Sequence, residues 1–267
     1  MPHRYDKILS ILKKRYLSKN ELATLLTPLA GLFGDTESEL EIFKNSGIPI
    51  EIAYSNVYFR PSLTSILEET FCIVDIETNG HNPYMHAPIE IGALKVHGGE
   101  VVDCFESLIY NAEIPEFITN ITGINVQMLE NAPKLTSVLE KFKLFLGDSI
   151  FVAHNVDFDY SFLSHSLNRC GFGYLYNPSL CTIKLAQKTL EAPRYSLGFL
   201  NEFLGINFHN LHRTLQDSRV TLEVFKAALK KIPKNLHTSK DLLEFSQNTP
   251  KVKHATTNKE SKKDSEL

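Results

Sequence analysis

Two carboxylates stand close together in an apolar stretch of this chain, the VDIETNG segment at residues 74–80. Residues two apart on a strand point to the same face, so Asp75 and Glu77 would project side by side. Burying two like charges is costly unless something compensates them, and Mg²⁺ prefers carboxylate oxygens. Gly80 ends the strand at a turn, which would place both acids at a sheet edge. An isolated D-x-E pair would instead favour an edge strand with a solvated acidic face.

A second acidic element is HNVDFDYSFL at residues 154–163. Asn155 or Asp157 could cap a helix, which would leave Asp159 near its first turn. Positions two apart lie on nearly opposite sides of a helix, so only one of Asp157 and Asp159 can face a cleft. The period does not decide between them. We interpret His154 and Asn155 as structural residues that hold the strand-to-helix turn through hydrogen bonds.

The third element is HRTLQD at residues 212–217. The helical period places Asp217 on the face that also carries Val220, Thr221 and Val224. Because that face would pack on a sheet, Asp217 points into the protein and again needs a cation. His212 precedes it by five residues, on the loop that leads into the helix.

Strands and helices that could position these acids follow one another between residues 68 and 233. Strands are expected first, and then strands that alternate with helices, which indicates an α/β domain with a mixed sheet flanked by helices. The expected strands cover residues 71–78, 89–99, 101–110 and 149–155, and the expected helices cover residues 134–148, 159–171 and 217–231.

Residues 1–62 are expected to form a separate small unit. Three short helices and a hairpin at residues 48–61 resemble a winged helix-turn-helix. This fold often reads DNA, but residues 1–60 hold eight Lys and Arg against seven Asp and Glu. The helix that would enter the DNA groove begins with Glu37, Glu39 and Glu41, which would repel phosphates. We therefore favour a protein-contact or positioning module over a DNA reader.

Composition limits how the chain can act. Of its 267 residues, 43% are hydrophobic, and the formal net charge is −3, so any nucleic-acid contact should be local rather than spread over a basic face. No C-x-x-C pair occurs, and we interpret the four cysteines as buried free thiols in a reducing compartment.

The ends of the chain carry two further expectations. The N-terminal residues lack the apolar region of a secretory signal, and no run of about 18 apolar residues predicts a membrane span. We therefore expect a cytoplasmic protein. Residues 234–267 are polar and are expected to form a disordered tail.

Together the three acidic segments resemble the motifs of the DEDDh (DnaQ-like) exonucleases, which have a ribonuclease-H-like fold. VDIETNG is similar to their first motif, HNVDFD to their second and HRTLQD to their third. Connecting segments are also similar, from residue 71 to residue 229, and resemble most the proofreading branch that includes the epsilon subunit of bacterial DNA polymerase III. Three motifs in this order and at this spacing are highly specific.

The resemblance implies a role for each matching residue. It assigns Asp75, Glu77, Asp159 and Asp217 to two divalent metal ions, Mg²⁺ or Mn²⁺, and so selects Asp159 over Asp157. It assigns His212 as the general base. The positions of Thr78 and Phe158 commonly line the terminal-nucleotide pocket. The site residues that the resemblance implies are thus Asp75, Glu77, Thr78, Phe158, Asp159, His212 and Asp217.

The implied activity is a 3′–5′ exodeoxyribonuclease that releases 5′-mononucleotides from a single-stranded or frayed DNA 3′ end. The implied setting is proofreading beside a replicative DNA polymerase subunit. One alternative is an exonuclease that trims RNA or degrades short oligonucleotides. Another is an inactive nucleic-acid-binding scaffold, which the presence of all four acids and the histidine disfavours.

Overall fold

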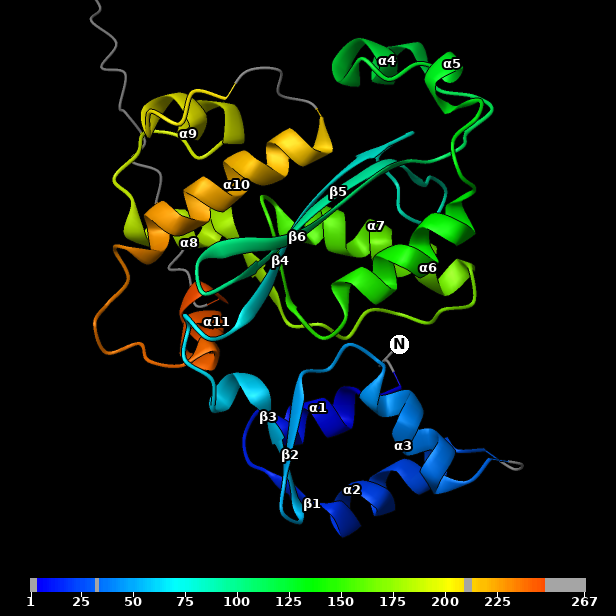
Figure 1. Cartoon of the computed structure of the whole chain (residues 1–267), viewed down its shortest axis with the longest axis vertical. Helices are drawn as coiled ribbons and strands as arrows, with labels where there is room; N and C mark the ends of the chain where they lie inside the picture. The colour runs from blue at the N-terminus through cyan, green and yellow to red at the C-terminus, as the bar shows by residue number, and fades with distance from the viewer. Residues whose placement is uncertain (1–3, 32–33, 209–212, 248–267) are drawn as a thin grey trace, which may run out of the picture.

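A computed structural model describes residues 4–31, 34–208 and 213–247 of the chain (Figure 1). Its N-terminal part contains a three-stranded antiparallel sheet of order β1-β3-β2. This confirms the winged-helix-like arrangement of small helices around a hairpin. The elements are α1 (Asp6–Leu12), β1 (Leu17–Ser18), α2 (Lys19–Leu26), η1 (Thr27–Leu29), α3 (Thr36–Lys44), β2 (Ile50–Ala53), β3 (Asn56–Phe59) and η2 (Arg60–Ser62).

Local side-chain bonds define where these small helices begin. Ser18 and Glu21 form a reciprocal capping box at α2. Asp35 caps α3 by accepting a hydrogen bond from the amide of Ser38 at 2.7 Å. The β2–β3 turn places Tyr54 at φ 55°, with its ring exposed to solvent.

The larger part of the chain is built on a five-stranded sheet of order β6-β5-β4-β7-β8. β4 pairs antiparallel with β5 and parallel with β7, so the sheet is mixed, as expected. Its strands are β4 (Thr70–Thr78), β5 (Pro88–His97), β6 (Glu100–Leu108), β7 (Ile150–Ala153) and β8 (Ser179–Cys181). Its helices are α4 (Glu116–Thr122), α5 (Val126–Leu129), α6 (Leu135–Leu146), α7 (Val156–Arg169), α8 (Thr182–Thr189), α9 (Leu197–Phe203) and α10 (Thr214–Leu229).

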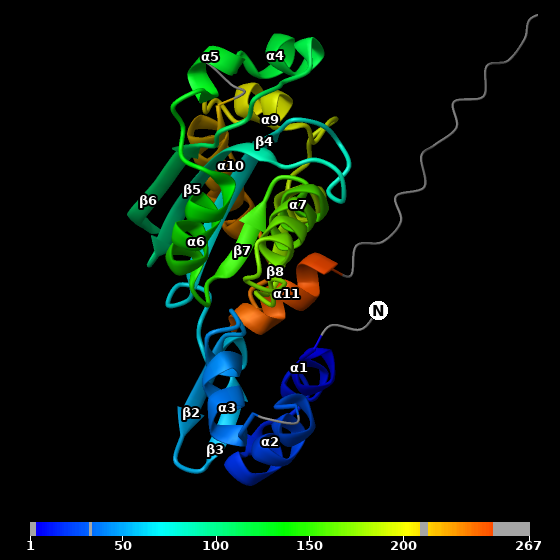
Figure 2. The same ribbon diagram turned by 90° about the vertical axis from the view of Figure 1, so that its right-hand side faces the viewer.

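Helices cover both faces of this sheet, with α10 on one side and α6 and α7 on the other (Figures 1 and 2). The alternation along β4 divides its side chains between the two cores. Phe71 and Ile73 belong to the cluster that contains Phe225 of α10. Cys72 and Val74 belong to the cluster that contains the buried residues of α6 and α7. Odd-numbered residues of β4 therefore face α10, a phase that continues to Asp75 and Glu77.

The N-terminal unit and the sheet domain share one continuous hydrophobic cluster. The ring of Tyr5 lies 5.1 Å from the rings of both Phe43 and Tyr176, which belong to different units. Arg60, in η2, donates hydrogen bonds to Glu69 at 3.0 Å and to the backbone carbonyl of Asp148 at 3.0 Å. The two units are thus joined by apolar packing and by a buried ion pair.

The expectation that a disordered tail begins at residue 234 is wrong for its first part. Residues 239–247 form helix α11 (Ser239–Gln247), in which Leu242 and Leu243 are buried. α11 packs on α8 and β8, and Thr238 forms a β-bridge with Ser65. The two leucines, together with partly buried Phe245, supply this apolar contact. Residues 248–267 lie outside the described residues.

All four cysteines are free, as predicted, but only Cys72 and Cys181 are buried. Cys104 is exposed and Cys170 is half-buried, so the expectation of buried thiols fails for these two. Across residues 4–31, 34–208 and 213–247, no helix is both long and apolar enough to span a membrane.

Candidate active site

Asp75 and Glu77 lie at the end of the central strand of the sheet. β4 has a neighbour on each side, so the alternative of a solvated edge strand is excluded. β7, however, pairs only with residues 71–73 of β4, which leaves the last residues of β4 without a partner on that side. A bulge after Glu77 ends the regular pairing with β5. The two acids therefore lie in an opening of the sheet beside a turn.

The third acid reaches this opening because α10 approaches β5 unusually closely. Gly92 lies opposite Asp75 in the β4–β5 register. A Cβ atom at Gly92 would lie 2.5 Å from the backbone nitrogen of Leu215, so only glycine permits this approach. The hydroxyl of Ser218 then donates a hydrogen bond to the carbonyl of Gly92 at 3.1 Å. These contacts hold Asp217 above the strand.

An ion pair between buried Glu90 and partly exposed Arg213 fixes the beginning of the same helix. Glu90, opposite Glu77 in the register, is fully buried. It accepts hydrogen bonds from Arg213 Nη2 at 2.7 Å and Nε at 3.1 Å, and from the amide of Thr214 at 3.2 Å. The last bond satisfies one of the backbone donors that a helix leaves unpaired at its start. We call Glu90, Gly92, Arg213 and Ser218 the α10 clamp.

Asp159 enters the site from the first turn of α7. Its carboxylate is 4% exposed, whereas Asp157 points away and pairs with Lys184 at 3.2 Å on the surface. The structure therefore decides the choice that the helical period left open. Asn155 begins α7 in the left-handed region, at φ 82°, and neither Asn155 nor Asp157 forms the side-chain cap that we considered.

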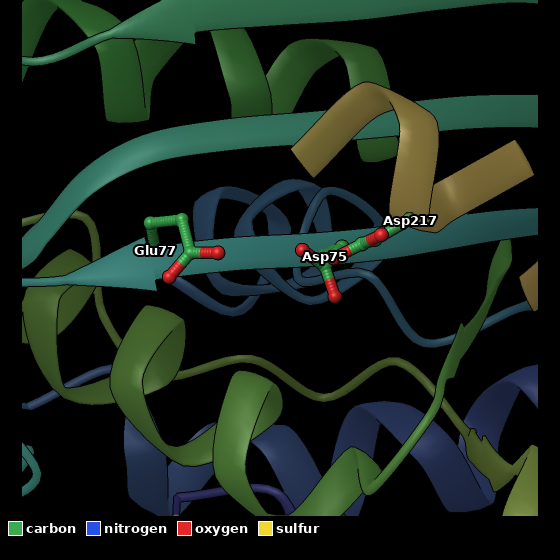
Figure 3. A group of neighbouring side chains, drawn as sticks. All are labelled: Asp75, Glu77 and Asp217. Atoms are coloured by element: carbon green, nitrogen blue, oxygen red, sulfur yellow. The ribbon is translucent and has the colours of Figure 1, made fainter. Parts of the chain in front are cut away.

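Three of the four predicted acids converge closely (Figure 3). One carboxylate oxygen from each of Asp75, Glu77 and Asp217 lies within 4.8 Å of the others. Asp217 is 7% exposed, and Asp75 and Glu77 are half-buried. Asp159 lies near Asp75, since its charge is the strongest electrostatic influence on that carboxyl group after burial itself.

Burial and mutual repulsion disfavour the charged forms of these groups. Burial first, and then the charges of Asp159 and Asp217, raise the pKa of Asp75 well above its ordinary value. Burial, with Asp217 and Glu90, raises the pKa of Glu77 to about 8. Burial also raises the pKa of Asp159, although hydrogen bonds from the backbone of Ile76 and of Asp159 itself oppose this.

This donor set fits a divalent cation. Among the described residues, no lysine, arginine or histidine forms an ion pair with Asp75, Glu77 or Asp159. Arg213, the nearby cation, is already bound to Glu90. A hard cation with oxygen ligands would compensate the clustered charges, as Mg²⁺ and Mn²⁺ do at carboxylate sites.

Of the remaining predicted residues, the structure describes Thr78, Phe158 and His154. Thr78 is buried and donates its hydroxyl to the carbonyl of Gly80 at 2.6 Å. Phe158 is half-buried, with its ring 4.8 Å from that of Phe162. His154 bonds to Thr182 and to the carbonyl of Tyr195, both at 2.8 Å, and burial lowers its pKa to about 4. This confirms its structural role, while His212 lies outside the described residues.

Sequence reasoning missed the α10 clamp. Glu90 carries the only charge in the apolar run at residues 88–94, and such a charge must be paired when buried. That signal marks Glu90 as structurally important, but it does not identify Arg213 as its partner. The role of Gly92 depends on the approach of a helix more than 100 residues later in the chain, which no local pattern reveals.

Raising the pH without divalent cations should destabilise the chain. The pKa of Glu77 is about 8 in the folded chain against an ordinary 4.5. The stability from its bound proton is therefore complete below about pH 4.5 and is lost as the pH rises through about 8. In EDTA, we expect Tm to fall by a few degrees more in the wild type than in Asp217→Asn across that window. At pH 8, Mg²⁺ should restore the wild-type Tm.

Calorimetry in matched buffers measures this difference, with Asp157→Asn as the control. That variant removes an exposed acid of α7 outside the cluster and should follow the wild type. If Asp217→Asn and the wild type showed parallel pH profiles, repulsion within the cluster would not be the cause.

Gly92→Ala should weaken metal binding by displacing α10. The new methyl group would overlap backbone atoms of Thr214 and Leu215, so Asp217 must move away from Asp75. We expect the affinity for Mn²⁺, measured by titration calorimetry, to fall roughly 10- to 100-fold, as for other supports of metal ligands. Ala93→Gly is the control, because Ala93 lies in the cluster on the opposite face. Equal affinities of both variants would contradict the proposed role of the close approach.

The chain matches the family model described as Exonuclease (RNase_T) over residues 72–225. It is 42% identical over 159 residues to the PolC-type DNA polymerase III of Thermotoga maritima, covering 59% of this chain and 12% of that protein. It is 34% identical over 183 residues to the PolC-type DNA polymerase III of Staphylococcus epidermidis, covering 68% of this chain and 12% of that protein. The chain thus spans about an eighth of these much longer relatives.

A solved structure shows the same fold at lower identity. Exonuclease I of E. coli, in complex with a dT13 oligonucleotide, is similar with a TM-score of 0.56 and 20% identity. The match covers 61% of this chain and 42% of exonuclease I. The mixed sheet flanked by helices is therefore the ribonuclease-H-like exonuclease fold. Sequence motifs, fold and family match agree, and the chain belongs to the DEDD-type exonuclease family, related to DNA polymerase III of the PolC type.

Proposed function

We propose that the chain is a 3′–5′ exonuclease of the DEDDh type that hydrolyses DNA from its 3′ end to 5′-mononucleotides. The observation that carries this proposal is the convergence of Asp75, Glu77 and Asp217 within 4.8 Å, with Asp159 beside them. Two divalent ions, Mg²⁺ or Mn²⁺, would be held by these four residues. Bound there, they would supply positive charge to the phosphoryl group and lower the pKa of the attacking water.

The protein's own contribution is to hold the ligands in place before substrate arrives. The charges of both Asp159, on α7, and Asp217, on α10, act on Asp75, so Asp75 would help to hold the ions together with each of them. Glu77 and Asp217 complete one side of the cluster, and Asp159 contributes to the other. The α10 clamp fixes Asp217 through backbone and side-chain bonds, which limits the movement needed on binding.

His212 is the proposed general base. It directly precedes Arg213 in the chain, and Glu90 holds Arg213 at the start of α10. Histidine suits this task because it titrates near neutral pH and can accept a proton from water. The histidine at this position also favours the DEDDh type over the variant that uses tyrosine.

Thr78 and Phe158 are proposed to contact the terminal nucleotide. Thr78 follows Glu77 directly, and Phe158 precedes Asp159, so both lie beside metal ligands along the chain. The half-buried ring of Phe158 offers an apolar surface to a base or sugar. The hydroxyl of Thr78 is engaged by Gly80, which leaves its methyl group and backbone for contact.

DNA is the favoured substrate, and proofreading beside a replicative polymerase subunit is the favoured role. The relatives at 42% and 34% identity are DNA polymerases, and the structural neighbour exonuclease I is described with a DNA oligonucleotide. RNA trimming or oligonucleotide degradation is the alternative enzyme function. A catalytically inactive scaffold is disfavoured because every predicted acid is present and three of them converge.

Purified protein with Mg²⁺ or Mn²⁺ should shorten a 5′-labelled single-stranded DNA step by step, and EDTA should stop the reaction. Asp159→Asn should lower the rate by roughly 100-fold or more, because it removes a carboxylate that would hold a divalent ion. Asp157→Asn is the matched control and should retain wild-type activity, since its carboxylate is exposed. The rates are measured from product ladders on denaturing gels.

The same assay with matched DNA and RNA oligomers tests the substrate. Faster hydrolysis of RNA would replace the DNA proposal with the trimming alternative. A 5′-labelled mononucleotide appearing as the first product would contradict the 3′–5′ direction. No metal-dependent hydrolysis of either polymer would favour the scaffold.

His212→Ala should lower kcat much more than it raises KM, because a general base acts on the attacking water and not on substrate binding. We expect a loss of about 100-fold in kcat at pH 7, within the range of such catalysis. The acidic limb of the wild-type pH–rate profile should also flatten in the variant. Stopped-time assays across the pH range measure both quantities, and an unchanged kcat with a raised KM would instead indicate a binding residue.

A further inference from the structure

A groove of about 1180 Å³ lies between the N-terminal unit and the sheet domain. One wall is α3, through Ile42 and Asn45, and the other is formed by the second half of α7 and the loop that follows it. The loop between β4 and β5 reaches the same groove through Tyr84. In Figure 1, α3 and the α6–α7 pair lie on either side of this region.

Aromatic rings follow one another along the sheet-domain side of the groove. Tyr84 is 71% exposed, and its ring centroid lies 4.4 Å from that of His165. The ring of His165 lies 5.8 Å from that of Tyr174, and Phe172 also lines the groove. Every nucleobase has a flat face that can stack on such rings, and proteins that bind single strands use this contact without reading sequence.

The charges of the groove suit a polyanion better than those of the whole chain. Its lining contains two basic side chains, Arg4 and Lys143, and one acid, Glu41. Arg4 is paired with Glu39 and Glu41 with Lys44 at 2.6 Å, whereas Lys143 donates a hydrogen bond to the carbonyl of Phe172. Asn45 and Asn168, both exposed, add amide groups that can bond to phosphate or base edges. The lining thus holds more basic than acidic side chains, on a chain with a formal net charge of −3.

The groove and the candidate active site share helix α7, which carries Asp159 in its first turn and His165 and Asn168 in its second half. Phe158 and His165 are seven residues apart, so they share one face of that helix. His165 lies six residues beyond Asp159, a distance of about 9 Å along the helix axis. A nucleic-acid strand with its 3′ end at the four acids could therefore follow this face into the groove within a few nucleotides.

The β4–β5 loop runs from the candidate active site to the groove, and hydrogen bonds hold it in place. It begins directly after the active-site strand, and Asn79 closes its base by bonds to the amide and carbonyl of Ala87. Arg169, at the end of α7, donates to the carbonyls of Tyr84 and His86 at 3.1 and 2.6 Å. Tyr84 is thereby presented at the mouth of the groove.

We propose that this groove binds single-stranded nucleic acid on the 5′ side of the terminal nucleotide, with unpaired bases stacked on Tyr84 and its neighbours. This inference rests on the proposed exonuclease function. It gives the N-terminal unit a role as one wall of the substrate path. A single strand is favoured over a duplex because the aromatic faces can stack only on bases that are not paired.

Binding of 5′-fluorescein dT12, measured by anisotropy in EDTA, tests the groove without hydrolysis. Tyr84→Ala should raise Kd roughly 5- to 30-fold, the effect expected for loss of one base–aromatic contact. Asn168→Asp adds a negative charge to an exposed position and should weaken binding more at low salt than at high salt. Tyr54→Ala is the matched control, since Tyr54 is an exposed tyrosine of the distant hairpin.

Hydrolysis assays with a long and a short substrate test the groove separately from the proposed exonuclease function. Tyr84→Ala should raise KM for dT12 and leave unchanged the hydrolysis of thymidine 5′-monophosphate p-nitrophenyl ester, which holds a single nucleotide. If dT12 affinity in both groove variants equalled that of Tyr54→Ala, the groove would not bind nucleic acid, and a protein ligand would be favoured. If the wild type bound dT12 but hydrolysed neither substrate, the exonuclease proposal would fail and the groove would stand.

Discussion

The close approach of α10 to β5 is the constraint on which the rest of the site depends. Carboxylates packed together and withdrawn from water repel one another, and the raised pKa values of Asp75 and Glu77 express that cost. The fold tolerates this repulsion because contacts outside the cluster hold α10 against β5. Gly92 permits the approach, Ser218 bonds to its carbonyl, and the ion pair of buried Glu90 with Arg213 fixes the helix start. A cation then stabilises what the scaffold has already arranged.

The arrangement of the other elements follows from this junction. β7 is shorter than β4, so the end of β4 is open on the side where α7 begins. Asp159 can therefore approach Asp75 from the helix on one face while Asp217 approaches from the helix on the other. Ligands from one strand and two helices on opposite faces meet only at such an opening. This explains why the site lies at the end of the central strand rather than at the side of the sheet.

Much of the fold and of the site could be predicted from the sequence, and there are physical reasons why the other features could not. The period of two along β4 placed Asp75 and Glu77 on one face, and the period of 3.6 aimed Asp217 inward. The helical period could not choose between Asp157 and Asp159, and burial made that choice. Long-range pairs such as Glu90 with Arg213 leave no local pattern. α11 was missed because it has only three large apolar residues, Leu242, Leu243 and Phe245, and its stability comes from tertiary contact with α8 and β8.

The role of the N-terminal unit can be inferred from how it is attached to the sheet domain. Its likeness to a winged helix suggests that it reads DNA. However, α3 lines a groove whose other wall belongs to the sheet domain. Glu39, which would repel phosphates if exposed, is buried and bound to Arg4 and to the hydroxyl of Tyr5. Glu41 is paired with Lys44 on the helix surface. The acids that argue against insertion into a DNA groove are thus largely used within the protein. A unit that shares its core with the sheet domain cannot move independently of it, so its natural contribution is a fixed wall beside the catalytic domain.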